Sequence, residues 1–137
     1  MKTLTLLLLI LAIAVRANAQ PSEITLDSAF SQLKGNGAAP FAKALYESDQ
    51  ENARQLVSQL SPLLTQAGEF FGYEIVSRRY LTKRVERIVI AIYFEKFPVY
   101  MRIDAYDTPK GRIFLAASCN KEASALLPFD LISASGK

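Results

Sequence analysis

The stretch that decides the fold runs from Val85 to Lys96 and reads VERIVIAIYFEK. Strongly apolar side chains recur at every second position, which is the period of a β-strand with one face in the core. The even positions form the predicted core-facing side of this strand: Ile88, Ile90, Ile92 and Phe94. Because the side chains between them point the other way, the same strand also predicts a second, separate sheet face.

Neighbouring segments show the same period of two and are separated by turn residues. We expect further strands over 71–81, 99–107 and 112–119, with turns at Lys83-Arg84, Phe97-Pro98 and 108–111. A short edge strand over 126–132 would add a fifth. Sequential strands with such short connections predict an antiparallel meander.

The chain before Gly68 has a helical period instead. Helices are predicted over 26–33, from Pro40, and from an N-cap at Ser48 or Asp49 to Gly68. Pro62 lies inside the last of them and predicts a kink or a junction of two helices. The fold class is therefore α+β, with N-terminal helices packed on one face of a curved antiparallel meander sheet of four to five strands.

The first nineteen residues have the layout of a secretory signal peptide. Lys2 precedes an apolar run from Leu4 to Val15, and Ala17-Asn18-Ala19 offers small residues at a cleavage site. We expect a signal peptide at 1–19, a flexible leader at 20–25, one domain at 26–132 and a frayed end at 133–137. The protein is then secreted or periplasmic, with no stable membrane anchor after cleavage.

Composition excludes several classes of chemistry. The chain has no His and one Cys, so it lacks a zinc-binding pair, a histidine-based nucleophilic centre and a disulfide framework. Loss of Lys2 and Arg16 with the signal leaves fourteen basic residues against thirteen acidic ones. Such a balance gives no overall positive electrostatic field that would attract nucleic acid. We also expect no cofactor and no metal.

The order of elements resembles the cystatin-like or nuclear-transport-factor-two-like α+β roll. The residues that carry the resemblance are Gly68 and Gly72 after the long helix, the 87–94 strand, the 97–100 turn and the Tyr106 to Arg112 hairpin. The resemblance covers about 26–132 and is to small exported bacterial members of unassigned function. It implies helices lying across a strongly bent sheet, and it does not imply one activity, because this fold hosts many. The inhibitory Gln-x-Val-x-Gly motif of cystatins is missing.

The second sheet face is the candidate site. Strand alternation places six candidate binding residues on it: Tyr93, Tyr100, Arg102, Asp104, Tyr106 and Phe114. Three interpretations are open, namely a face covered by the chain itself, a homodimer interface, and a pocket for a small apolar or anionic ligand. The function predicted is an exported, non-enzymatic binding or dimerisation module.

Asp104 has two interpretations. It can form an ion pair with Arg102, two residues away on the same strand, or across a dimer with Arg102 of a second copy. Alternatively, Asp104 could act as a general base with Tyr100 and its neighbours as hydrogen-bond donors, an arrangement similar to that of ketosteroid isomerase. That second interpretation would make the protein a small enzyme.

The basic cluster near the first hairpin and the single cysteine each have two interpretations. A basic cluster surrounds the first hairpin, at Arg78, Arg79, Lys83, Arg84 and Arg87, and fits either a solvated turn or an anionic partner. Cys119 continues the predicted inward alternation, which favours a buried thiol over an intermolecular disulfide.

Overall fold

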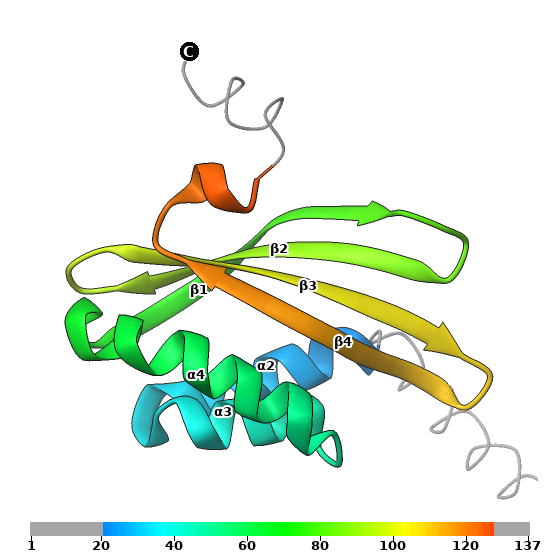
Figure 1. The fold of residues 1–137 in the computed structure, drawn as a ribbon, viewed down its shortest axis with the longest axis horizontal. Helices are drawn as coiled ribbons and strands as arrows, with labels where there is room; N and C mark the ends of the chain where they lie inside the picture. Colours follow the sequence, from blue (N-terminus) through cyan, green and yellow to red (C-terminus); the bar gives the residue numbers. More distant parts are fainter. Residues whose placement is uncertain (1–20, 128–137) are drawn as a thin grey trace, which may run out of the picture.

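The computed structural model describes residues 21–127 as helices followed by one sheet (Figure 1). The sheet has the order β1-β2-β3-β4, and all neighbouring strands are antiparallel. The predicted α+β class and the meander are confirmed. The elements are α2 (Pro21–Asn36), α3 (Ala38–Tyr46), α4 (Gln50–Ala67), β1 (Phe70–Tyr80), β2 (Val85–Phe94), β3 (Pro98–Thr108), β4 (Gly111–Asn120) and the short η2 (Ala123–Ala125).

Local chemistry explains the helix boundaries. Asp49 caps α4, because its carboxylate accepts a hydrogen bond from the backbone N–H of Asn52 at 3.1 Å. Gly68 ends the helix with φ of 84°, and a Cβ there would lie 2.8 Å from Glu95 Oε2. The positive φ is the constraint that favours glycine, because Glu95 Oε2 is the end of a flexible, exposed side chain. Between Asp49 and Gly68, α4 is one helix through Pro62, so the predicted junction of two helices is wrong.

The ends of the domain differ in part from the sequence prediction. α2 begins at Pro21, so most of the segment predicted as a flexible leader belongs to the first helix. Proline suits this place, because the first helical residue needs no hydrogen-bonded N–H. The signal peptide and the frayed end lie outside the described residues. The predicted edge strand lies mostly outside them too, and only Leu126 and Leu127 are described, neither of them in a strand.

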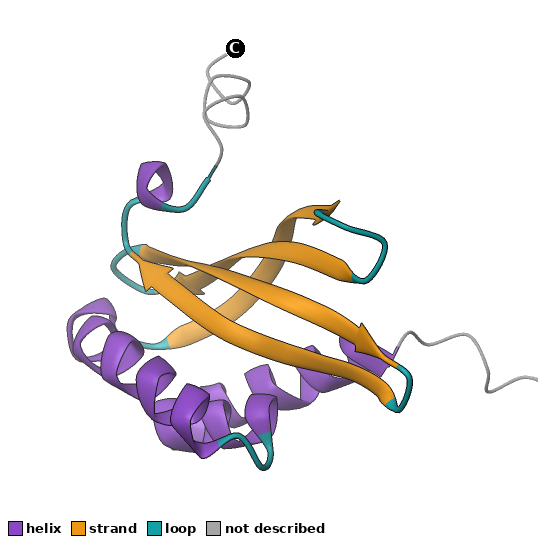
Figure 2. Ribbon diagram, turned by 45° about the vertical axis from the view of Figure 1, so that its right-hand side comes forward, coloured by secondary structure: helices purple, strands orange, loops and turns teal. Residues whose placement is uncertain are grey.

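The helices all lie on one face of the sheet, which we call the inner face (Figure 2). α4 packs mainly along β4, and α2 contacts β1. The predicted core-facing side of β2 is confirmed, because Ile88, Ile90 and Ile92 are fully buried in one cluster with helix residues such as Phe30 and Leu60. β3 adds alternate residues to the same cluster: Val99, Met101, Ile103 and Ala105.

A β-bulge in β4 changes which residues face the helices. Ala105 pairs with Phe114 and Ile103 pairs with Ala117, so two residues of β4 lie opposite Asp104 alone. Phe114 therefore lies in the helix-facing core and not on the second face, where simple alternation placed it. That prediction is wrong, because one extra residue in a strand reverses the alternation before or after it.

Side chains from the helices close the β4 edge. The Tyr46 hydroxyl donates to the Leu115 carbonyl at 2.8 Å, and burial raises the pKa of this phenol. The Gln59 side chain makes two such contacts. Its Nε2 donates to the Ala117 carbonyl at 3.1 Å, and its Oε1 accepts from the Cys119 N–H at 2.9 Å. These contacts occupy backbone groups that an edge strand otherwise leaves open to another chain. No helix of residues 21–127 has the length and apolarity to cross a membrane.

Candidate functional site

The candidate site is the outer face of the sheet, opposite the helices. Strand pairing places Tyr100 beside Ala91, Arg102 beside Val89 and Asp104 beside Arg87. Tyr93 and Tyr106 follow in the same alternation. Five of the six predicted site residues therefore share this face, and Phe114 is the exception. All five are partly exposed.

An aromatic pair marks one end of the outer face. β1 is irregular between Phe70 and Gly72, and the additional residue, Phe71, stacks on Tyr93 with ring centroids 6.0 Å apart. Phe71 is 69% exposed, the largest value among the exposed large apolar residues. The Tyr93 hydroxyl donates to Glu74 at 2.7 Å, and this hydrogen bond raises the pKa of the phenol. Phe71 was not among the predicted site residues, although two adjacent aromatic residues at the start of a strand cannot both point inward.

Asp104 forms its ion pair with Arg87, and not with Arg102 as predicted. Arg87 Nε and Nη2 lie 2.8 and 2.9 Å from the two carboxylate oxygens of Asp104. Directly paired residues on adjacent strands have Cβ atoms about 5 Å apart, whereas residues two apart on one strand are separated by about 7 Å. The nearer cation therefore takes the carboxylate, and the hydrogen bond to Asp104 raises the pKa of Arg87.

This ion pair weighs against Asp104 as a general base. Both of its oxygens accept hydrogen bonds from one guanidinium. Taking a proton from a substrate would require Asp104 to give up part of that contact. Arg102, by contrast, has no hydrogen bond or ion pair within residues 21–127 and lies among the tyrosines of the outer face.

Part of the outer face is covered by the chain itself. Val89 and Ala91 lie on this face and are buried, and Leu126 is buried outside the helix-facing cluster. The η2 turn just before Leu126 lies on the side of the sheet opposite the helices (Figures 1 and 2). The aromatic surface that stays accessible is consequently centred on Phe71 and Tyr93, with Arg102 and Tyr106 further along the sheet.

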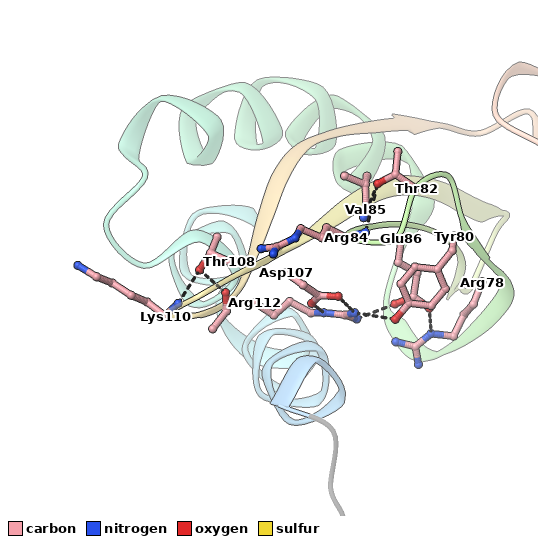
Figure 3. Close-up of polar contacts among 11 residues, drawn as sticks. Arg78, Tyr80, Thr82, Arg84, Val85, Glu86, Asp107, Thr108, Lys110 and Arg112 are labelled. Carbon is pink, nitrogen blue, oxygen red and sulfur yellow. Dashed lines mark hydrogen bonds and ion pairs between the residues drawn. The ribbon is translucent and has the colours of Figure 1, made fainter.

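A second polar cluster lies on the inner face, beyond the helices, where β1–β2 and β3–β4 turn (Figure 3). Glu86 is buried and accepts from Arg78 at 2.9 Å and from Arg112 at 2.6 Å. Arg112 also holds Asp107 at 2.6 Å and donates to the Tyr80 hydroxyl at 3.1 Å. The Arg112 hydrogen bond lowers the pKa of the Asp107 carboxyl and raises that of Arg112. We call these five residues the Glu86 network.

Only part of the predicted basic cluster takes part in ion pairs. Arg78 and Arg87 are held in ion pairs, whereas Arg79, Lys83 and Arg84 are exposed. The sequence analysis missed Arg112 as a partner of Glu86, because the two lie on strands that are not neighbours. The only available signal was a charged residue at a core-facing position of β2.

Two features lie away from the outer face, namely Cys119 and the grooves beside α3. The thiol packs against the core, as predicted, and burial raises its pKa to about 12. No group of three His, Cys, Asp or Glu able to hold a metal occurs among the described residues. Two open grooves flank α3, between Ala39, Lys43 and Glu47, and neither is lined by an outer-face residue.

Comparison with known proteins returned no match to any protein-family model, curated protein or solved structure.

Proposed function

We propose that the protein is an exported binding module that associates through the outer face of its sheet, with a second copy as its partner. The observation that carries the proposal is the solvent-exposed stack of Phe71 on Tyr93, continued by half-buried tyrosines and Arg102. Tyr, Phe and Arg are enriched at the centres of protein interfaces, whereas most exposed sheet faces are polar.

The charged residues of the outer face support binding of a protein partner better than they support catalysis of a reaction. Asp104 is neutralised by Arg87 within the chain, so it adds little net charge to the surface. Arg102 has no ion pair within residues 21–127, and Glu74 beside Tyr93 is the carboxylate that a second copy would offer it. A two-fold arrangement makes each such contact twice, once in each direction.

Sedimentation velocity and native mass spectrometry of the secreted protein test the proposal. Wild type should dimerise, and Phe71→Ser and Arg102→Glu should each weaken association at least tenfold, because each removes an interface contact. Lys43→Glu on α3 is a matched charge reversal on the opposite side and should leave the dimer intact. A wild type that stays monomeric at high concentration refutes self-association, and a retained small molecule in the native spectrum would replace it with ligand binding.

We also propose that the fold is a roll of the cystatin-like or nuclear-transport-factor-two-like type, and that the protein is exported by a cleaved signal peptide. Three helices across one face of an antiparallel four-stranded sheet are compatible with a cystatin-like or nuclear-transport-factor-two-like roll. Export predicts that the mature protein begins at Gln20. N-terminal sequencing checks this, and an intact 1–19 segment in exported protein would contradict it.

A further inference from the structure

Two hairpin turns lie side by side at one end of the sheet. The Asp107 N–H donates to the Arg84 carbonyl at 2.8 Å, and the Arg112 guanidinium joins the second hairpin to Tyr80 of the first. Figure 1 shows both turns at the same end of the molecule, and Figure 3 shows the contacts between them. We define the hairpin end as residues 78–86 and 107–113.

Side-chain hydrogen bonds fix the shape of both turns. The Thr82 hydroxyl accepts from the backbone N–H groups of Arg84 and Val85, at 3.2 and 3.1 Å. The Thr108 hydroxyl donates to the Gly111 carbonyl at 2.6 Å and accepts from the Lys110 N–H at 3.2 Å. Ordered turns lose less conformational entropy when their side chains meet a surface.

Large apolar side chains are exposed at this end. Tyr80 is 57% exposed, Leu81 is 46% exposed and Ile113 is 49% exposed. Tyr80 and Leu81 are adjacent at the first turn, whereas Ile113 pairs with Tyr106 and lies on the outer face at the β4 edge. An apolar side chain at a protruding turn can insert into an apolar environment while the rest of the sheet keeps its conformation.

Positive charge surrounds these apolar side chains. The hairpin end carries six cations against two carboxylates, whereas the rest of 21–127 carries seven cations against ten carboxylates. Both carboxylates, Glu86 and Asp107, are already held by arginines of the Glu86 network. The cations exposed around the apolar side chains are Arg79, Lys83, Arg84 and Lys110.

We propose that the hairpin end binds reversibly to the surface of an anionic phospholipid bilayer. Cations alone would suit any polyanion, but exposed Leu81 between Tyr80 and Lys83 favours a partner that accepts an apolar group below an anionic layer. A lipid surface has that order, with acyl chains beneath charged head groups. Phe71 and Tyr93 lie at the other end of the sheet from the two turns, so membrane binding and self-association use different residues.

Co-sedimentation of the mature protein with phosphatidylglycerol-containing vesicles tests the proposal, with pure phosphatidylcholine vesicles as the neutral comparison. We expect binding to the anionic vesicles only, weakened by salt. Lys83→Gln and Arg84→Gln should each lower the partition coefficient about fivefold. Leu81→Ser should lower it about tenfold. Arg54→Gln on α4 is the matched loss of an exposed cation elsewhere and should change nothing.

Three results would overturn the proposal. One is no binding to anionic vesicles at low salt, and another is equal loss from Arg54→Gln and Lys83→Gln. The third is a Leu81→Ser protein that binds vesicles like wild type, since binding would then be a general attraction to polyanions such as nucleic acid. Phe71→Ser should bind vesicles normally and Leu81→Ser should dimerise normally, so failure of either proposal is distinguishable from failure of the other.

Discussion

Replacing Phe114 with Ala tests the β4 bulge directly. The side chain is only 8% exposed and packs in the helix-facing core. An aromatic side chain buries about 150 Å² or more, and apolar burial contributes about 25 cal/mol per Å², so truncation should cost about 4 kcal/mol. That figure agrees with about 3–5 kcal/mol for buried Phe→Ala changes in general. In a domain of this size it corresponds to a fall in Tm of about 15 °C.

Leu115→Ala is the matched comparison. Leu115 is 37% exposed, and its contact with Tyr46 uses the backbone carbonyl, which the substitution keeps. We expect a cost below about 1 kcal/mol. Urea unfolding and thermal melts followed by circular dichroism measure both variants. If Leu115→Ala destabilised the domain more than Phe114→Ala, β4 would alternate without the bulge, and the reasoning would fail.

Three other substitutions or reactions test separate parts of the structure. Ile90→Asp should unfold the domain, because it buries an unpaired carboxylate, whereas Lys83→Asp in the exposed turn should leave Tm nearly unchanged; similar melts would contradict the face assignment of β2. Cys119 should react with iodoacetamide far more slowly than a free thiol at about pH 8, because a pKa of about 12 leaves little thiolate, and rapid labelling of folded protein would show the thiol is not buried. Arg112 lowers the pKa of Asp107, so this pair stabilises the fold above about pH 4 and is lost as pH falls through the folded value; Asp107→Asn should flatten the acid loss of Tm, and an unchanged slope would exclude that contribution.

The sequence predicts most of the fold because its strongest signals are local. The period of two along β2 depends only on which face is buried, and Ile88, Ile90 and Ile92 are buried as the pattern requires. Gly68 and Asp49 mark helix ends through the conformation and hydrogen bonds of neighbouring residues. Such signals need no knowledge of distant contacts.

The wrong predictions concern residues whose positions depend on how neighbouring strands pair. The sequence of a single strand does not determine that pairing. The bulge opposite Asp104 depends on the register between β3 and β4, so alternation alone placed Phe114 on the wrong face. The partner of Asp104 depends on the register between β2 and β3, which sets Arg87 beside it. Arg112 and Glu86 are harder still, because they are two strands apart and meet only in the folded sheet.

The contact between Arg112 and Tyr80 spans the full width of the sheet on its inner face. These residues lie on β4 and β1, the two edges, which would be about 14 Å apart in a flat four-stranded sheet. Their side chains nevertheless meet at 3.1 Å above the inner face, beside buried Glu86. Two long side chains span this width, and the two turns are adjacent because β2 and β3 are paired neighbours, with the Asp107 N–H donating to the Arg84 carbonyl. Substitutions within the Glu86 network would remove contacts of both hairpins at once, so surface residues such as Leu81 test lipid contact without disturbing the links between the strands.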